Sequence, residues 1–285
     1  MDGKVFALVT ALCFGLNPVT LKMGFARAGR PDVTVAVGLL VAVPIYFLLL
    51  PLAGGPHLEV LTVPAVIGFI LGGLFGGGIG RRWLAVAIDK IGAAPATAIK
   101  NSAPVISTML AVLVLGESVT LIQWLAMLGI VIGITLVAWR RGAGLKQLAG
   151  VGVLAAAGAA LSYGIRPLFL EFALDEANVP LTGALIGAIA ALLYSVVLTK
   201  WGDIKDGFRH RSIWLFLFSG VLQSIGFLAL TVGLSSGDVS VVYPVTSSAP
   251  LFTLAFTGLL LRGTEQVTWR IVVGVILVVT GVIVL

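Results

Sequence analysis

Long apolar stretches and short polar connectors alternate along the whole chain. Each apolar stretch spans roughly 20 residues, the length that an α-helix needs to cross the hydrocarbon core of a bilayer. Since no water is available there, such stretches satisfy their backbone hydrogen bonds internally, as helices. The pattern predicts an all-α integral membrane protein with about ten transmembrane helices, over residues 4–24, 33–52, 63–87, 94–115, 119–138, 149–169, 180–199, 213–233, 239–261 and 267–285.

Four of these stretches contain a proline next to polar or small residues. The fourth stretch carries Asn-Ser-Ala-Pro at 101–104, and the ninth carries Ser-Ser-Ala-Pro at 247–250. A proline inside a helix removes a backbone hydrogen bond and clashes with the preceding turn. We therefore expect these helices to bend, and the candidate helix-bending residues are Pro18, Pro104, Pro167 and Pro250.

The two similar motifs lie 146 residues apart, about half the chain, and other matches follow the same offset. Phe-Gly-Leu-Asn-Pro at 14–18 matches Tyr-Gly-Ile-Arg-Pro at 163–167, 149 residues later. Chance similarity between apolar segments is the alternative, but the matches keep their order and include polar residues. The sequence predicts two five-helix repeats, residues 1–142 and 143–285. Because five is an odd number, the second repeat enters the membrane inverted, an arrangement typical of secondary transporters.

The charge distribution gives an independent test of this topology. Basic residues gather in the odd-numbered connectors, and the even-numbered connectors contain only acidic charges. Cytoplasmic loops carry the excess of Lys and Arg, so we predict a multi-pass protein of the cell (inner) membrane with both termini extracytoplasmic. The basic residues of the odd connectors are Lys22, Arg27, Arg30, Lys90, Arg140, Arg141, Lys146, Lys200, Lys205, Arg209, Arg211 and Arg262.

Composition excludes several other classes. The chain is 59% hydrophobic and 11% charged, against about 25% charged in soluble proteins. The net charge of +6 is scattered between apolar runs, so no nucleic-acid partner is expected. The single Cys13 allows no intramolecular disulfide and no cysteine-based metal site. No H-E-x-x-H, P-loop or G-x-S-x-G motif is present, so we predict no enzyme, cofactor or metal.

Polar side chains inside membrane helices are costly, so their positions suggest function. Arg166 and Lys100 are the strongest candidates for holding a substrate carboxylate, although an arginine near a helix end also snorkels to the interface. Asn17 has two readings, an interhelical hydrogen bond or a substrate contact. The serines of the ninth stretch also have a structural reading, because serine often bonds back to its own helix. The second and seventh stretches are almost wholly aliphatic, and we expect them to form the outer wall.

The paired prolines, the (Asn/Ser)-Ser-Ala-Pro motifs and the Gly116-Glu117 turn before the fifth helix resemble the drug/metabolite transporter superfamily. The closest group is its EamA-type ten-helix exporters, and the resemblance covers the whole chain. It implies a basket-like bundle around a central cavity and export of small metabolites. Carried over by position, the implied substrate-binding residues are Asn17, Trp83, Lys100, Asn101, Tyr163, Arg166, Gln223, Tyr243, Ser247 and Ser248. The basic residues Arg81, Arg82, Lys100 and Arg166 depart from the family pattern.

We therefore expect a secondary transporter that exports small polar metabolites, amino acids first, by alternating access. Transport of organic anions such as sugar phosphates is the alternative within this class. An intramembrane enzyme or lipid-binding scaffold is the alternative from another class, and it would require a His, Asp or Cys cluster at membrane depth. The expected partners are a small-molecule substrate and membrane lipid. The coupling ion, the substrate and the oligomeric state stay open, and a monomer is allowed.

Overall fold

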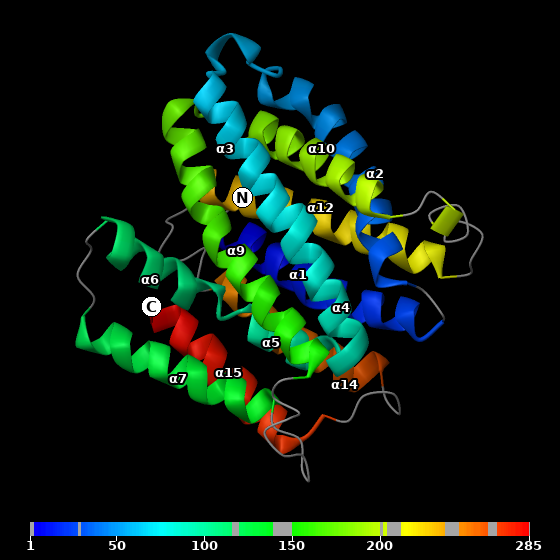
Figure 1. Cartoon of the computed structure of the whole chain (residues 1–285), viewed down its shortest axis with the longest axis vertical. Coiled ribbons are helices and arrows are strands. Elements are labelled where there is room, and N and C mark those ends of the chain that lie inside the picture. The colour runs from blue at the N-terminus through cyan, green and yellow to red at the C-terminus, as the bar shows by residue number, and fades with distance from the viewer. Residues whose placement is uncertain are drawn as a thin grey trace.

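The computed structural model describes residues 3–27, 30–115, 120–138, 150–199, 202–203, 212–236, 245–261 and 267–284. Within these residues all regular structure is helical, which confirms the all-α prediction (Figure 1). The first half contains α1 (Gly3–Phe25), α2 (Pro31–Leu49), η1 (Leu50–Ala53), η2 (Leu58–Val60), α3 (Val63–Gly73), η3 (Leu74–Gly80), α4 (Arg81–Ile91), α5 (Ala93–Lys100), α6 (Ala103–Leu115) and α7 (Leu121–Ala138). The second half contains α9 (Val151–Glu176), α10 (Pro180–Leu198), α12 (Ile213–Ser236), α14 (Ala249–Leu260) and α15 (Trp269–Val284).

Described helices lie in all ten stretches that the hydropathy pattern predicts. Five of them are each long and apolar enough to cross a bilayer on their own, so the protein is a multi-pass membrane protein. The other helices are shorter or broken, and the total of ten spans stays a prediction. The five long spans are Lys4–Phe25, Val63–Ile91, Val151–Glu176, Pro180–Leu198 and Ile213–Leu230.

The fourth and ninth stretches are interrupted at their proline motifs. A turn at Asn101 and Ser102 separates α5 from α6, and a turn at Ser248 precedes α14. Pro104 and Pro250 are each the second residue of the helix that follows. Proline is well accepted there, because the first turn of a helix has no use for its missing N–H. The motifs therefore mark helix breaks, with each proline starting the second segment.

The two halves pack against each other through reciprocal contacts. A Cβ added to Gly15 of α1 would lie 3.0 Å from the carbonyl oxygen of Ala249 in α14. A Cβ added to Gly164 of α9 would lie 2.8 Å from the carbonyl oxygen of Ala103 in α6. Gly15 is the repeat counterpart of Gly164, and Ala103 is that of Ala249. The same contact thus recurs with the halves exchanged, as a two-fold axis requires.

Helices α7 and α15 pack side by side and run in opposite directions (Figure 1). Gly133 lies against the backbone of Gly274, and Gly281 lies against the backbone of Ala126. Since the chain number rises on one helix as it falls on the other, these counterpart helices are antiparallel. The two repeats are therefore inverted. Gly129 and Gly133 form a Gly-x-x-x-Gly pattern, which predicts that both glycines pack against the neighbouring helix. A Cβ added to Gly129 instead meets nothing within 4 Å.

The third stretch is one continuous apolar helix, Val63–Ile91, whose centre is the π-helical segment η3. π-Helical turns are uncommon and frequently occur at functional sites. The segment is rich in glycine, and it packs against α9 and α10. It ends at Gly80, so the wide turn directly precedes Arg81, a buried arginine.

Helix α2 does not form an outer wall, so this expectation is wrong. Val33, Val35 and Val37 are almost fully buried, and α2 packs against α4, α10 and α12. An aliphatic helix has no polar face to distinguish a lipid contact from a protein contact, so its composition could not decide between them. Exposed apolar side chains occur towards its end, at Phe47 and Leu48.

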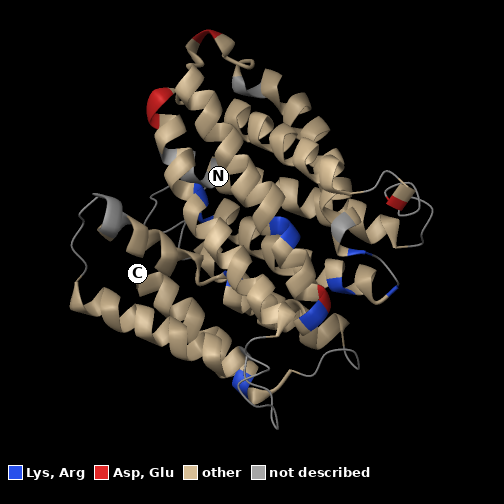
Figure 2. Cartoon of the chain, viewed as in Figure 1, with Lys and Arg blue, Asp and Glu red and all other residues tan. Residues whose placement is uncertain are grey.

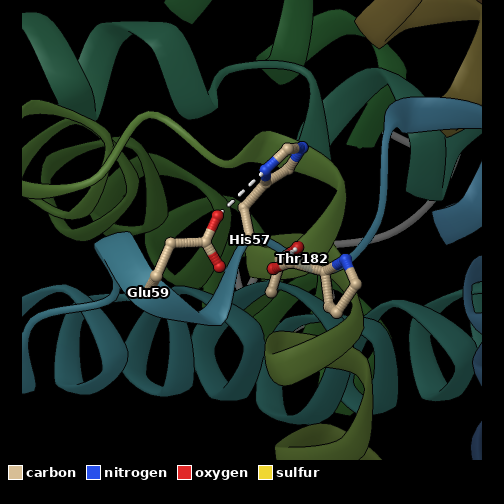
Figure 3. A network of polar contacts seen from close by, with 4 residues as sticks. His57, Glu59 and Thr182 are labelled. Atoms are coloured by element: carbon tan, nitrogen blue, oxygen red, sulfur yellow. Dashed lines mark hydrogen bonds and ion pairs between the residues drawn. The ribbon is translucent and has the colours of Figure 1, made fainter.

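The connector between α2 and α3 is held to the start of α10 by a small polar network (Figure 3). Thr182 donates a hydrogen bond to the carbonyl oxygen of Pro56 at 2.7 Å, and the ring of His57 lies 3.4 Å from the carboxylate of Glu59. His57 has a positive φ of 45°, a conformation that few residues other than glycine adopt. The network fixes this end of the bundle.

Candidate functional site

Three basic side chains lie in the interior of the bundle, and two of them lie over aromatic rings. The Nζ of Lys100, at the end of α5, lies 5.0 Å from the ring centroid of Tyr163 in α9. The guanidinium of Arg166, one turn further along α9, lies 5.5 Å from the ring centroid of Phe227 in α12. Arg81, the first residue of α4, is only 6% exposed. The predicted candidates Lys100, Tyr163 and Arg166 are therefore brought together.

Two tyrosines lie near both arginines. Tyr163 and Tyr46 each lie within electrostatic range of both Arg81 and Arg166. Tyr46 is buried in α2, hydrogen-bonded to Ser224, with its ring centroid 5.9 Å from that of Phe227. We call Arg81, Lys100 and Arg166, with the rings of Tyr46, Tyr163 and Phe227, the basic cluster. It joins helices of both repeats.

Sequence analysis missed Arg81, Tyr46 and Phe227 as site residues. Arg81 is adjacent to Arg82, and the two side chains point about 100° apart. The sequence pattern does not show which of the two faces the interior of the bundle. Tyr46 had a usable signal, because Tyr194 lies 148 residues later, close to the repeat offset. Its isolation in an aliphatic stretch was the other signal.

A glycine lies against each guanidinium group. A Cβ added to Gly38 of α2 would lie 2.5 Å from Nη2 of Arg81 and 3.0 Å from its Cζ. A Cβ added to Gly76 of η3 would lie 2.8 Å from Nε of Arg166. Neither distance is tolerable for non-bonded atoms, so each guanidinium occupies space that any larger residue would fill. The two glycines thus set where the arginine heads lie.

The acidic residues whose side chains the structure describes lie away from the basic cluster. Figure 2 shows acidic residues at the ends of the bundle, while some basic ones lie among the helices. None of the ion pairs among the described side chains involves the basic cluster. The acidic residues whose side chains the structure describes are Glu59, Asp89, Asp175, Glu176 and Asp203. Buried charges without a partner carry a penalty of several kcal/mol per ion.

Hydrogen bonding in the cluster is also incomplete. Nη2 of Arg81 and Nε of Arg166 are buried N–H groups without a hydrogen-bond partner among the described residues. Most buried polar groups in proteins are paired, so an unpaired donor calls for an explanation. Two unpaired donors on cationic groups suit an anionic ligand, because charge-assisted hydrogen bonds to carboxylate or phosphate are the strong ones.

Asn17 takes part in a helix-to-helix contact. Its side-chain amide donates to the carbonyl oxygen of Ser219 at 2.7 Å and to the hydroxyl oxygen of Ser219 at 3.1 Å. Both residues are buried. The structure thus displays the interhelical hydrogen bond, between α1 and α12, and the substrate contact stays a prediction.

The broken helices touch at equivalent residues. The amide of Asn101 donates to the carbonyl oxygen of Ser247 at 3.4 Å, and these two residues are repeat counterparts, 146 apart. A contact between counterparts lies on the two-fold axis itself. Ser248 donates its hydroxyl to Val245 at 2.6 Å, and Ser102 does the same to Ile99 at 2.7 Å. The back-bonding reading is therefore seen for Ser248.

The remaining candidates lie in varied places. Trp83 is 45% exposed, and its indole packs against Gly158 of α9. Gln223 is half-buried in α12. Tyr243 lies outside the described residues. Pro18 and Pro167 lie inside α1 and α9.

Comparison with protein families gives two matches along the chain. The model of the EamA-like transporter family matches residues 1–139 and again residues 150–285. The chain belongs to the EamA-like transporter family. Since one family model matches twice, the duplication inferred from the paired motifs is confirmed. The boundary at 142/143 lies in a segment outside the described residues and stays a prediction.

The chain is also similar to one curated protein and to one solved structure. The uncharacterized protein MJ1333.1 of Methanocaldococcus jannaschii is 28% identical over 126 residues, which are 44% of this chain and 89% of that protein. That relative is therefore about as long as one repeat. A solved crystal structure has a TM-score of 0.63 at 19% identity, covering 99% of this chain and 94% of its own, so the two share a fold.

Proposed function

We propose that this EamA-like protein is a secondary transporter that exports small polar metabolites by alternating access, with amino acids as the first candidates. The basic cluster carries this proposal. It joins both repeats, and inverted-repeat transporters bind their substrates where the repeats meet. Charged residues within membrane helices commonly mark the path of a solute.

Lys100 and Arg166 hold the substrate carboxylate in this proposal. They come from different repeats, so a bound carboxylate would link the two halves. Tyr163 lies against Lys100 and offers a face to the remainder of the substrate. Tyr243 provides further apolar surface, as the family resemblance implies, and Asn101 with Ser247 lies on the axis about which the halves exchange conformations.

Organic anions such as sugar phosphates are the second candidate. One observation favours them, namely the number of cations. A single carboxylate does not neutralise three basic groups, and no described acidic side chain pairs with them. A zwitterionic amino acid would also need a partner for its ammonium group.

The orientation follows from the positive-inside rule. We propose that the odd-numbered connectors face the cytoplasm of a cell with an inner membrane and that both termini are extracytoplasmic. Lys22 and Lys90 then lie on the cytoplasmic side, where Lys22 donates to the carbonyl oxygen of Asp89 at 2.6 Å. Export means movement away from this basic end.

A liposome assay tests the proposal. Purified protein is reconstituted, and efflux of labelled amino acids and of sugar phosphates is compared with that from protein-free liposomes. We expect Lys100→Ala and Arg166→Ala to reduce transport of the active substrate about tenfold or more, the usual effect of losing a charge-assisted hydrogen bond. Arg270→Ala is the control, because Arg270 contacts Trp269 in α15. Efflux that is unchanged in both variants, at equal folded yield, refutes the proposed site.

A further inference from the structure

The sequence-based candidates for charge recognition, Lys100 and Arg166, leave Arg81 unexplained. Arg81 is the most deeply buried of the three, at 6% exposed, and it starts α4 directly after η3. An arginine that only snorkels to lipid phosphate extends its head towards the membrane surface. The head of Arg81 instead lies against the backbone of α2 at Gly38, and within electrostatic range of Tyr46 and Tyr163.

The adjacent Arg82 supplies a comparison within the same helix. Arg82 is half-buried and has no contact with the basic cluster among the described interactions. Arg81 and Arg82 are the same residue type at adjacent positions of α4. Their side chains point in different directions, because successive helical residues point about 100° apart. Burial of Arg81 is thus a feature of how α4 is rotated, and Gly38 provides the space that permits it.

Arg81 and Arg166 share three properties. Each has its guanidinium against a glycine, Gly38 or Gly76. Each has one buried N–H group without a partner, and each lies near both Tyr163 and Tyr46. Cation–π contact, as Arg166 makes with Phe227, lowers the cost of burying a cation but does not neutralise its charge. Arg81 and Arg166 therefore lie near the same two tyrosines, the ammonium of Lys100 lies over Tyr163, and no described acidic side chain pairs with any of the three.

We infer that Arg81, seated on Gly38, binds the substrate together with Lys100 and Arg166, and that the bound group carries two negative charges. This inference rests on the proposed function and narrows it. A phosphate monoester fits, because it carries nearly two charges at neutral pH and three strong acceptor oxygens. A pair of carboxylates fits too, including that of an acidic amino acid. The shared chemistry is a compact dianion that accepts hydrogen bonds from Nη2 of Arg81 and Nε of Arg166.

Gly38 is a positioning residue in this account. It touches the guanidinium of Arg81 and reaches the substrate only through it. Substituting Gly38 by alanine leaves the charge of Arg81 in place but displaces its head. The effect on affinity should then resemble that of removing the charge, although no basic residue has been changed.

The experiment is a binding measurement on the full-length protein in phosphatidylcholine nanodiscs, by calorimetry. The probes are matched pairs: glycerol 3-phosphate with its methyl phosphodiester, and aspartate with alanine. Each pair differs by one negative charge. We expect the member with the second anionic charge to bind about tenfold or more tightly than its partner in at least one pair, as one additional charge-assisted hydrogen bond provides. The pair that shows the preference distinguishes phosphate from dicarboxylate.

The variants test the residues. Arg81→Gln and Gly38→Ala should each reduce that preference to about twofold or less, and Arg82→Gln and Gly129→Ala should leave it unchanged. If Arg81→Gln does not yield folded protein, Gly38→Ala and Arg81→Lys answer the same question. Equal affinity for both members of each pair overturns the inference, and so does a preference that survives Arg81→Gln and Gly38→Ala.

Two further outcomes separate the inference from the proposed function. Transport of alanine with no preference for dianions would leave a transporter in place and remove the dianion site. Arg81 and Arg166 could also be neutralised by a lipid phosphate. In that case the two members of each probe pair would bind with equal affinity in phosphatidylcholine nanodiscs. Their affinities would also be unchanged in phosphatidylglycerol nanodiscs. This result overturns the inference as well.

Discussion

Two glycines on α7, four residues apart, should respond oppositely to the same substitution. Gly129 meets nothing within 4 Å, so a methyl group there enters open space. At Gly133 the added Cβ would lie 2.7 Å from the carbonyl oxygen of Gly274 and 2.9 Å from a methyl group of Val278. The neighbours at Gly133 include backbone, which cannot rotate away. Gly133→Ala therefore forces α7 and α15 apart, and Gly129→Ala does not.

The magnitude follows from two opposing terms. Alanine is favoured over glycine in a helix interior by roughly 1 kcal/mol, a term that applies at both positions. Overpacking a close contact costs roughly 1–3 kcal/mol, a term that applies only at Gly133. We expect Gly129→Ala to be neutral or stabilising by up to about 1 kcal/mol. Since the helix term cancels in the comparison, Gly133→Ala should be less stable than Gly129→Ala by about 1–3 kcal/mol.

The measurement is the unfolding free energy of both variants in one detergent, by denaturant titration with tryptophan fluorescence. Gly281→Ala is the internal check, because Gly281 makes the counterpart contact, 2.8 Å from the carbonyl oxygen of Ala126. It should behave like Gly133→Ala. Equal stability of the Gly129 and Gly133 variants, or a destabilising Gly129→Ala, would show that α7 and α15 do not pack through these faces.

Two more predictions address the other half of the bundle and its orientation. A double-mutant cycle of Asn17→Ala and Ser219→Ala should give a coupling energy of about 0.6 kcal/mol in the unfolding free energy, which is the average for interhelical hydrogen bonds in membranes. A coupling energy near zero, together with a raised KM for transport, would favour the substrate role of Asn17. In a Cys13→Ser background, single cysteines at positions Glu59 and Lys90 should react with a membrane-impermeant maleimide only from opposite sides, the former from outside intact cells. Labelling of both from the same side contradicts the membrane crossing of Val63–Ile91 between them.

Much of the fold follows from patterns that the chain repeats. The apolar period predicts the helices, and the motifs at 101–104 and 247–250 predict the breaks. The repeat is visible because the contacts between the halves are made through small residues and prolines at fixed offsets. At Gly15 and Gly164, a larger residue would meet the backbone of the facing helix. Since such positions tolerate few substitutions, both repeats have glycine there.

The candidate site was predicted only in part, for a different physical reason. Lys100, Tyr163 and Arg166 stand out because polar residues in apolar helices are costly. Their neighbours depend on how each helix is rotated about its axis, and an aliphatic helix gives no signal for that rotation. Tyr46 could be recognised only through its repeat counterpart Tyr194, and Arg81 could not be distinguished from the adjacent Arg82. Gly38 could not be recognised either, because its role depends on an arginine of another helix.

The two repeats share a scaffold but differ in their chemistry. By the offsets of the paired motifs, the counterparts of Arg81, Lys100 and Arg166 are Phe227, Thr246 and Asn17, none of which is charged. The packing glycines, in contrast, recur in both halves. In the proposed alternating-access mechanism, the two halves would adopt each other's conformations, which constrains the scaffold but not the charges. The three cations therefore have no charged counterparts across the symmetry axis. In the proposed mechanism, a dianion bound to these cations would meet an environment that differs between the two states.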